Sequence, residues 1–400
     1  MKKVCFMMPT IFNIGGEQRV VSVLCNALNK RGYEVSVLLF DNRFEENYEL
    51  YNLNKDIKIK YVDGYQGFSR RLCRKIRNLN SKYGFLKKLN CINKFLVKRS
   101  FPFENVVSQL KQIKPDILIG VAGEFNLLAC LLKDVFPEIK IIGWQHSSFD
   151  AYFNTKGRRH YNEKDFFVDM VKKLDKYIVL TKKDKQKMKE TFNIDATCIY
   201  NIKSFNCMKK SNLLSHQFIS VGRMDKVKGF DLLIEAYNEF YNNNPANDWK
   251  LVIIGDGDER ECLEKLIKAY NLEKCVFLPG YSNNVIDYYL NSSIYIMSSR
   301  WEGFPMVLSE CMELGLPIVS FDIDVMKEFI SNGTDGILVE KGNIHDLANA
   351  MKKLSEDVKL RKFIAKNEAK KIKELSEDNI LEQWEQIFKE FEDNENRKIY

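Results

Sequence analysis

The stretch Arg300-Trp301-Glu302-Gly303-Phe304-Pro305-Met306-Val307-Leu308-Ser309-Glu310 decides how the chain folds. An apolar, strand-like run at residues 293–299 precedes it, and a second apolar run, Ile318–Phe321, follows it. This pattern predicts a strand, a glycine-containing turn, a helix and a second strand in succession. Pro305 is expected in the first helical turn, where its missing N–H costs no hydrogen bond. The stretch is therefore one unit of an alternating α/β sheet.

Two carboxylates in this stretch are candidate ligand-binding groups. A strand that passes into a helix through such a turn presents free backbone N–H groups and a positive helix-dipole end, at the sheet edge where α/β proteins bind ligands. Glu302 lies in the turn, where a carboxylate accepts hydrogen bonds from sugar hydroxyls rather than binding phosphate. Glu310, about two helical turns further on, would share that face and hold other hydroxyls, such as those of a ribose. The alternative makes Glu302 a helix-start acid and Glu310 a solvated surface residue.

The Glu302-to-Glu310 spacing, with Gly303, Phe304 and Pro305 inside it, resembles the signature of the family-4 retaining glycosyltransferases, which have the two-domain GT-B fold. Other segments match that family in order along nearly the whole chain: Gly15-Gly16, His146, Ser220-Val221-Gly222-Arg223, Lys228-Gly229-Phe230-Asp231 and Ile254-Gly255-Asp256-Gly257. Each segment alone is weak, but their order and spacing together are specific. The resemblance implies an α/β protein with two Rossmann-like, doubly wound domains that face each other across a cleft.

The domain boundaries follow from this resemblance and from the alternation of apolar runs. We expect an acceptor-side N-terminal domain at residues 1–204, a nucleotide-sugar-binding domain at 205–376, and a terminal helix at 377–400 that crosses back to the first domain. The polar segment 204–215 is the expected linker. The strands expected in the second domain span residues 217–221, 250–254, 275–278, 294–297, 318–321 and 336–339.

Composition limits the class of protein. With 400 residues and 45% hydrophobic content, the chain can bury two sizeable cores. The apolar run at residues 4–8 is too short for a signal peptide or a membrane span, so we expect a cytoplasmic protein. Ten scattered cysteines without a C-x-x-C pair or a Cys/His cluster indicate reduced thiols. We expect no metal and no cofactor, and we interpret the Asp-x-Asp segments at Asp256 and Asp322 as coincidental.

Positive charge is concentrated in the first half of the chain. Residues 1–200 hold 36 Lys and Arg against 21 Asp and Glu, a balance of +15, so the other half carries −7 of the total +8. Segment 65–103 has no acidic residue. Its cations are Arg70, Arg71, Arg74, Lys75, Arg77, Lys82, Lys87, Lys88, Lys94, Lys98 and Arg99. Apolar residues recur between them at steps of three and four, which predicts a basic amphipathic helix pattern, broken near Gly84.

Three interpretations of this basic insert, residues 65–103, remain open. In the first, a helical pair buries its apolar stripe on the first domain and the lysines are merely solvated. In the second, the insert attaches to an anionic membrane surface, where each basic residue contributes roughly 1 kcal/mol. The third is nucleic-acid binding, which no helix-turn-helix, zinc finger or ribonucleoprotein-type motif supports. We expect a membrane partner and no nucleic acid.

The resemblance assigns roles to residues outside the opening stretch. Gly15 and Gly16 would let the backbone approach a diphosphate or sugar closely, and this loop contacts the donor in the family. His146 occupies the place of a donor-sugar histidine, although a lone histidine can also be structural. Arg223 and Lys228 can clamp a diphosphate, Arg through its fork and Lys as a point charge; the alternative is two surface cations. Gly280 lies where the family holds the nucleobase through backbone groups.

The resemblance implies a metal-independent retaining hexosyltransferase. Its donor is a nucleotide-sugar, here expected to be a UDP-sugar, and Gly303, Phe304 and Pro305 join the carboxylates in holding it. Its acceptor is expected to be a lipid-linked glycan or an oligosaccharide in surface polysaccharide biosynthesis, at the inner face of the cell membrane. The acceptor hydroxyl attacks from the same face as the departing phosphate, which takes its proton. The alternatives are a nucleotide-sugar epimerase of the same fold and a non-catalytic nucleotide-sugar-binding membrane scaffold.

Overall fold

The computed structural model describes residues 2–158, 160–244 and 247–399. The chain divides into two compact units, each built around its own sheet. Unit 1 comprises Met1–Ile202 together with Glu377–Tyr400, and unit 2 comprises Lys203–Ser376. The division therefore falls two residues before the expected boundary at residue 204. Unit 1 is discontinuous in sequence, because its last helix comes after the whole of unit 2.

Unit 1 contains a parallel sheet of seven strands in the order β3-β2-β1-β4-β5-β6-β7. Its central strands read as continuous apolar runs, because helices cover a parallel sheet on both faces. The strands are β1 (Lys3–Met8), β2 (Glu34–Leu39), β3 (Lys58–Tyr61), β4 (Ile117–Val121), β5 (Lys140–Trp144), β6 (Lys176–Val179) and β7 (Thr197–Cys198). The strand order reverses at the neighbouring strands β1 and β4: β2 and β3 lie on one side of β1, and β4 to β7 lie on the other.

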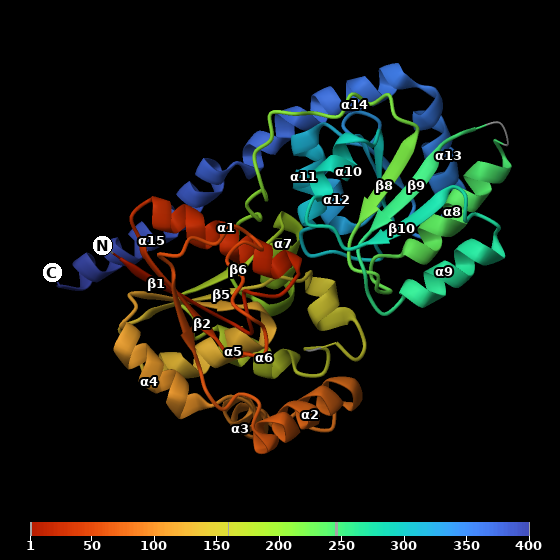
Figure 1. Ribbon diagram of the computed structural model, residues 1–400. Helices are drawn as coiled ribbons and strands as arrows, with labels where there is room; N and C mark the ends of the chain where they lie inside the picture. The colour runs from red at the N-terminus through yellow and green to blue at the C-terminus, as the bar shows by residue number, and fades with distance from the viewer. Residues whose placement is uncertain (1, 159, 245–246, 400) are drawn as a thin grey trace. The chain divides into compact units, whose positions relative to one another are not determined.

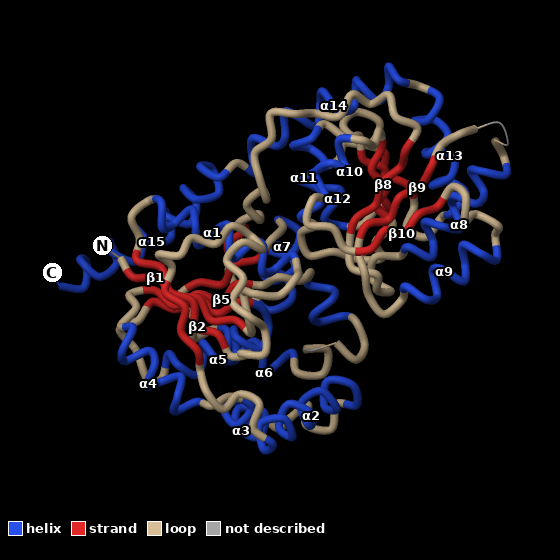
Figure 2. Tube along the Cα trace, viewed as in Figure 1, coloured by secondary structure: helices blue, strands red, loops and turns tan. Residues whose placement is uncertain are grey.

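Helices flank this sheet on both sides (Figures 1 and 2). They are α1 (Gly16–Lys30), α2 (Phe68–Tyr83), α3 (Asn90–Ser100), α4 (Phe103–Ile113), α5 (Ala122–Lys133), α6 (Lys164–Val171), α7 (Lys182–Phe192) and α15 (Glu377–Ile399), with a π-helical turn at Asp150–Asn154. The insert predicted from its basic amphipathic pattern contains α2 and α3, and the chain bends between them at Gly84, which has a left-handed φ of 73°.

Unit 2 contains a parallel sheet of six strands in the order β10-β9-β8-β11-β12-β13. The strands are β8 (Gln217–Val221), β9 (Lys250–Ile254), β10 (Val276–Gly280), β11 (Ile294–Met297), β12 (Ile318–Phe321) and β13 (Ile337–Val339). The helices are α8 (Phe230–Asn242), α9 (Arg260–Ala269), α10 (Val285–Leu290), α11 (Met306–Leu314), α12 (Asp324–Phe329), α13 (Ile344–Glu356) and α14 (Val358–Lys371), with a 3-10 turn at Ile372–Leu375. In this sheet the strand order reverses at the neighbouring strands β8 and β11.

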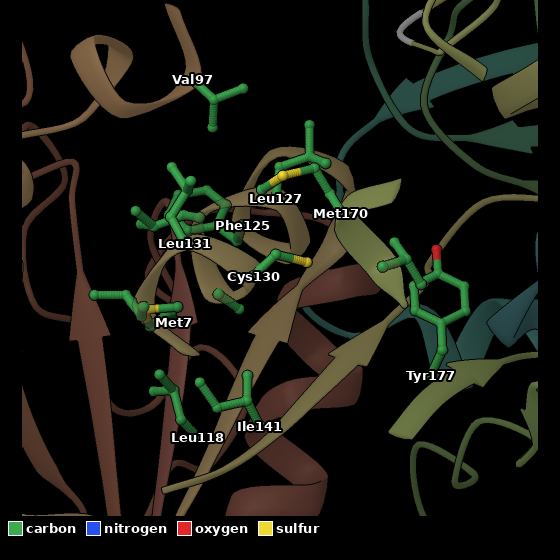
Figure 3. Packing of buried hydrophobic residues seen from close by; sticks show 14 of the residues in the cluster. Met7, Val97, Leu118, Phe125, Leu127, Cys130, Leu131, Ile141, Met170 and Tyr177 are labelled. Carbon is green, nitrogen blue, oxygen red and sulfur yellow. The ribbon is translucent and has the colours of Figure 1, made fainter. Parts of the chain in front are cut away.

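The core of unit 1 lies between the sheet and the helices on one of its faces, among them α3 and α5 (Figure 3). Met7, Leu118 and Ile141 enter it from three adjacent strands and are fully buried. Leu127 and Leu131 enter the core from α5, and Val97 enters it from the buried side of α3. The expected doubly wound α/β architecture is therefore present in unit 1, with the buried strands that a two-sided core requires.

The terminal helix α15 packs on unit 1. Its Trp384 is 1% exposed and contacts the ring of Trp144, at the end of β5, with 5.0 Å between ring centroids. The Lys2 ammonium donates to the Phe388 carbonyl at 2.6 Å, which ties the helix to the start of β1. No helix in the described part of the chain combines the length and apolar character needed to span a lipid bilayer.

We predict that Trp384→Ala destabilises unit 1 by about 3–5 kcal/mol, because it leaves a cavity against Trp144. The exposed Phe363 on α14 supplies the control, since Phe363→Ala should change the free energy of unfolding by about 0.5 kcal/mol or less. Urea titration followed by circular dichroism measures both variants. Equal, small losses in the two variants would contradict the packing role of Trp384.

Candidate functional site

The candidate site in unit 2 begins where the loops after β8 and β9 meet. The Gly222 N–H donates to the Ile254 carbonyl at 2.9 Å, and the Met224 N–H donates to the Asp256 carbonyl at 2.8 Å. Arg223 is held between these two bonds. A Cβ atom at Gly255 would lie 1.9 Å from the Gly222 oxygen, so this close approach requires glycine. The matched segments Ser220-Val221-Gly222-Arg223 and Ile254-Gly255-Asp256-Gly257 therefore form one backbone assembly.

Lys228 and Glu302 form an ion pair at the reversal point between β8 and β11. The Lys228 ammonium lies 2.7 Å from Glu302 Oε1, and the side chains are 22% and 11% exposed. Ser299 Oγ donates to the same carboxylate oxygen at 2.6 Å. Low exposure strengthens the attraction, and removal of one partner leaves a poorly solvated charge. Two residues 74 positions apart thus meet at the edge where open α/β sheets bind ligands.

Backbone contacts hold Lys228 in this position. Asp225 accepts from the Val227 and Lys228 N–H groups through Oδ1, at 3.0 and 3.2 Å. The Lys228 carbonyl accepts from Ser298 Oγ at 3.0 Å. Gly229 follows with a φ of 63°, and a Cβ atom there would lie 2.2 Å from the Ser298 oxygen. The Lys-Gly segment therefore packs directly against the end of β11.

Arg223 has a different environment from Lys228. Its side chain is 77% exposed, and Nε donates to Asp225 Oδ2 at 2.8 Å. An exposed pair of this kind contributes little to stability. The structure does not bring the Arg223 guanidinium into the Lys228–Glu302 pair.

Sequence reasoning missed a second ion pair that supports this edge. Arg300 donates to both oxygens of Asp231, at 2.9 and 2.7 Å, and to the Lys226 carbonyl at 2.7 Å. The planar guanidinium is suited to such bidentate contacts. One indication of this pair was present in the sequence: Arg300 and Asp231 have opposite charges and lie in two of the segments that match the family. The pair joins the first turn of α8 to the loop after β11, three residues beyond the end of that strand.

The turn between Glu302 and α11 is short and packed. Pro305 immediately precedes the first helical residue, Met306, so the prediction that it lies within the first turn is wrong by one position. Phe304 is buried and packs on Phe329 with 5.2 Å between ring centroids, and Gly303 is half-buried beside it. No side chain caps α11 at Pro305. This packing holds the turn that carries Glu302.

Glu310 belongs to a separate, buried network. It is 2% exposed, so its interpretation as a solvated surface residue is wrong. Tyr289 donates to Oε2 at 2.8 Å and Ser204 donates to Oε1 at 2.9 Å. Burial, reinforced by the neighbouring carboxylate, raises the pKa of Tyr289, which keeps the phenol protonated and donating. Ser204 comes from the expected linker, which therefore lies against α11.

Gly280 closes the site on the side of β10. It has a φ of 87°, and its carbonyl accepts from the Gly255 N–H at 3.0 Å. The Arg260 guanidinium donates to the nearby Leu278 carbonyl at 2.8 Å. Gly280 therefore joins the same backbone assembly as Gly255. A cavity of about 610 Å³ lies elsewhere in unit 2, lined by residues that include Asp322, Lys327, Asn332 and Lys341, and it contains none of the expected site residues.

In unit 1, Gly15 and Gly16 lie where the chain passes from the loop after β1 into α1. Gly15 precedes the helix, and its N–H donates to the Tyr51 hydroxyl at 2.8 Å. Within the described ranges of the chain, no side chain caps α1. Tyr51 is a contact that the sequence pattern did not reveal, because it lies 36 residues away.

His146 follows β5 of the same sheet. Its ring centroid lies 4.1 Å from that of Trp144, and its Nε2 atom is enclosed and has no hydrogen-bond partner among the described residues. Burial lowers the pKa of His146 to about 3, so the imidazole is neutral near pH 7. Asp184, another residue that sequence reasoning missed, supports this loop by accepting from the Phe149 N–H at 2.9 Å. Burial raises the pKa of Asp184 to about 6.

Two family models match the chain. The model described as glycosyl transferases group 1 matches residues 208–371, and the model described as Glycosyltransferase Family 4 matches residues 14–202. Every expected site residue lies within one of these two ranges.

Three relatives match nearly the whole chain. An uncharacterized glycosyltransferase of Haemophilus influenzae is 29% identical over 97% of this chain and 100% of its own length. The amylovoran biosynthesis glycosyltransferase AmsD of Erwinia amylovora is 26% identical over 97% and 99%. The GalNAc-alpha-(1->4)-GalNAc-alpha-(1->3)-diNAcBac-PP-undecaprenol alpha-1,4-N-acetyl-D-galactosaminyltransferase of Campylobacter jejuni is 26% identical over 98% and 99%.

Solved structures match the fold. A TarM variant from S. aureus, crystallised with fondaparinux, alpha-GlcNAc-glycerol and UDP, has a TM-score of 0.76 at 17% identity and covers 97% of this chain and 100% of its own. Sucrose-phosphate synthase from Thermosynechococcus elongatus has a TM-score of 0.76 at 15% identity, with 98% and 99% coverage. These likenesses confirm the GT-B fold of two Rossmann-like domains.

We predict that Gly229→Ala is more destabilising than Gly342→Ala. Both glycines have positive φ, 63° and 82°, which costs an alanine about 1–2 kcal/mol. Only at Gly229 does the added Cβ meet a backbone oxygen, whereas nothing lies within 4 Å at Gly342. The clash should add about 1–3 kcal/mol to the loss. Urea denaturation measures the difference, and equal losses would show that the loop is not packed against β11.

We also predict that His146 makes the protein less stable in acid. The unfolded chain binds a proton as the pH falls through about 6.5, whereas the folded chain does not until about pH 3. This contribution to stability is therefore complete above pH 6.5 and falls as the pH decreases towards 3. Between pH 7 and pH 5 the wild type should lose on the order of 1–2 kcal/mol more than His146→Gln. Parallel losses in urea titrations would contradict the buried neutral imidazole.

Proposed function

Because the chain belongs to glycosyltransferase family 4, we propose that it transfers a hexose from a UDP-sugar to a hydroxyl of a lipid-linked glycan, with retention of configuration. The UDP in the TarM crystal supports the choice of nucleotide. The PP-undecaprenol in the name of the Campylobacter relative supports a lipid-linked acceptor, and the amylovoran relative supports polysaccharide biosynthesis. The protein would work in the cytoplasm, at the inner face of the cell membrane.

The Lys228–Glu302 pair is the observation that carries this proposal. A nucleotide-sugar offers a diphosphate next to a sugar with several hydroxyls. In the proposed complex Lys228 turns to the diphosphate and Glu302 accepts from the sugar hydroxyls, so each group exchanges its present partner for one of matching chemistry. The substrate thereby satisfies both charges at a site where neither is well solvated. Arg223, which contacts the same Asp225 carboxylate that accepts from the Lys228 N–H, would add a planar fork to the diphosphate.

His146 is the proposed sugar contact from unit 1. Its neutral ring can exchange hydrogen bonds with a hydroxyl without adding charge to the site. The enclosed Nε2 atom has no partner in the described structure, and buried polar atoms of this kind normally have one. A hydroxyl of the bound nucleotide-sugar would be that partner. Gly303, Phe304 and Pro305 hold the turn from which Glu302 acts.

The remaining donor contacts are assigned to the nucleotide. Gly15 and Gly16 offer backbone N–H groups at the start of α1, which favours the diphosphate. Glu310 would bind the ribose, because a carboxylate accepts hydrogen bonds from hydroxyls, as it does from those of Tyr289 and Ser204. Gly280 and its neighbours would hold the base through backbone groups.

The proposed reaction needs no metal and no dedicated side-chain base. The acceptor oxygen forms a bond to the anomeric carbon on the face from which the diphosphate departs, and the bond between that carbon and the phosphate oxygen breaks. The departing phosphate oxygen takes the acceptor's proton. Negative charge grows on the diphosphate during this step, so Lys228 and Arg223 stabilise the transition state more than the ground state.

We predict that Glu302→Gln and Lys228→Gln each lower turnover by roughly 100- to 1000-fold, the usual effect of removing one transition-state contact. Glu356→Gln is the matched control, because Glu356 forms a surface pair with Lys352 on α13. The measurement is mass-spectrometric detection of the nucleotide released from UDP-, GDP- and ADP-sugars, with and without a membrane lipid extract.

Release of UDP that requires the lipid extract, and that is lost in the two site variants only, would support the proposal. Turnover without a glycosylated product would indicate an epimerase or a hydrolase instead. Tight nucleotide-sugar binding without any turnover would indicate a scaffold. Full activity of Glu302→Gln and Lys228→Gln would exclude the assigned roles.

A further inference from the structure

The helix α2 has its apolar side outward. Phe68, Leu72, Leu79 and Tyr83 follow one another at helical spacing, and they are 85%, 47%, 42% and 66% exposed. The residues that α2 buries are Arg77, Asn80 and Ser81, all of them polar. The interpretation in which the insert buries its apolar stripe on the first domain is therefore wrong for α2.

Arginines on the other side of α2 hold the helix in this orientation. Arg74 donates to the Ser100 carbonyl at 2.7 Å and to the Tyr65 carbonyl at 3.0 Å, and its guanidinium lies 4.1 Å from the Tyr65 ring. Arg77 is 2% exposed and lies between two buried carboxylates, 3.5 Å from Glu124 and 3.8 Å from Glu163. Rotation of the helix to bury its apolar side would leave these charges without partners, at a high cost.

Helix α3 and its connection to α2 extend the exposed apolar surface. Val97 is fully buried in the core of unit 1 and Leu96 is 7% exposed, so α3 is firmly seated (Figure 3). Yet Phe85, Leu89, Ile92 and Phe95 are 55%, 42%, 39% and 56% exposed. We call these eight exposed side chains, four from α2 and four from the connection and α3, the α2–α3 face. The two helices pack against each other (Figure 1).

This concentration exceeds the usual scatter of apolar side chains on a surface. Among the described residues, 15 large hydrophobic side chains are exposed, and eight of them lie within residues 68–95. Single exposed apolar residues need no explanation, whereas clustered ones mark an interaction site.

Cations surround the α2–α3 face. The exposed ones are Arg71, Lys75, Lys82, Lys87, Lys88, Lys94, Lys98 and Arg99. Among the described residues, Lys94 is the only one of these with a carboxylate within ion-pair distance, at 3.3 Å from Asp134. Segment 65–103 itself holds no acid. The surface therefore combines apolar side chains with uncompensated positive charge.

We propose that the α2–α3 face docks on an anionic lipid bilayer, with its apolar side chains among the acyl chains and its cations at the headgroups. A second copy of the chain would bring the same positive charge against itself. A nucleic acid would match the charge but not Leu72, Leu79, Leu89 and Ile92, which have no ring to stack on a base. A bilayer with acidic headgroups matches both properties.

The proposal concerns binding to a surface and does not depend on the reaction proposed above. The test is co-sedimentation of the full chain with vesicles of phosphatidylcholine, with and without phosphatidylglycerol, at low and at high salt. The wild type should bind vesicles that contain phosphatidylglycerol and detach at high salt. Its binding to pure phosphatidylcholine should be weak.

Two variants and two matched controls identify the surface. Phe68→Ser with Leu72→Ser should weaken binding by about tenfold or more, because less apolar area enters the bilayer. Lys75→Gln with Lys82→Gln and Lys87→Gln should weaken binding by about a hundredfold, since each cation near the surface contributes roughly fivefold. Helix α14 supplies the controls, because it carries exposed Phe363, Lys359, Lys362 and Lys366. Phe363→Ser and the three α14 Lys→Gln changes should leave binding unchanged.

Circular dichroism and urea titration show whether the variants remain folded. Loss of vesicle binding in the α2–α3 variants alone, with the fold and the free energy of unfolding intact, supports the proposal. No binding by the wild type, equal losses in the α14 controls, or a wild type that self-associates or binds single-stranded nucleic acid through these residues would overturn it. A protein that binds vesicles through this face but transfers no sugar would contradict the proposed function and leave the docking surface standing.

Discussion

The site in unit 2 depends on how closely the backbone can approach itself at one edge of the sheet. The loops after β8, β9 and β10 are joined by hydrogen bonds from Gly222 to Ile254 and from Gly255 to Gly280, and a side chain at Gly255 would collide with the first of these loops. Gly229 makes a similar approach to the end of β11. The Gly229 contact places Lys228 next to the end of β11, where its ammonium lies 2.7 Å from Glu302 Oε1. The arrangement of this edge therefore depends on glycine at positions where a side chain would collide with a neighbouring loop.

The sequence predicted the architecture well because its cause is local. The runs at 217–221, 250–254, 294–297 and 318–321 have the same bounds as β8, β9, β11 and β12, since buried parallel strands are continuous apolar runs between turns. The GT-B fold followed from the order of matched segments. Pro305 was misplaced by one residue, which is within the usual uncertainty of a helix start.

The sequence pattern could not predict contacts between residues that are far apart in the chain. It named Lys228 and Glu302 but could not show that they pair, because they are 74 positions apart in the sequence. It left open whether Glu310 was solvated, since burial there depends on Tyr289 and Ser204. It predicted the amphipathic pattern of α2 correctly but left open which side of the helix faces the core. That choice was made by Arg74 and Arg77, whose partners lie in other elements.

The discontinuity of unit 1 has a consequence for the order in which the chain acquires its structure during synthesis. Unit 2 is a continuous segment, Lys203–Ser376, and all of it leaves the ribosome before α15 does. Trp144, next to His146, lacks its contact with Trp384 until α15 has been translated, after the whole of unit 2. Unit 1 begins first but is completed after unit 2, and a ribosome that stops before α15 releases a finished unit 2 attached to an incomplete unit 1.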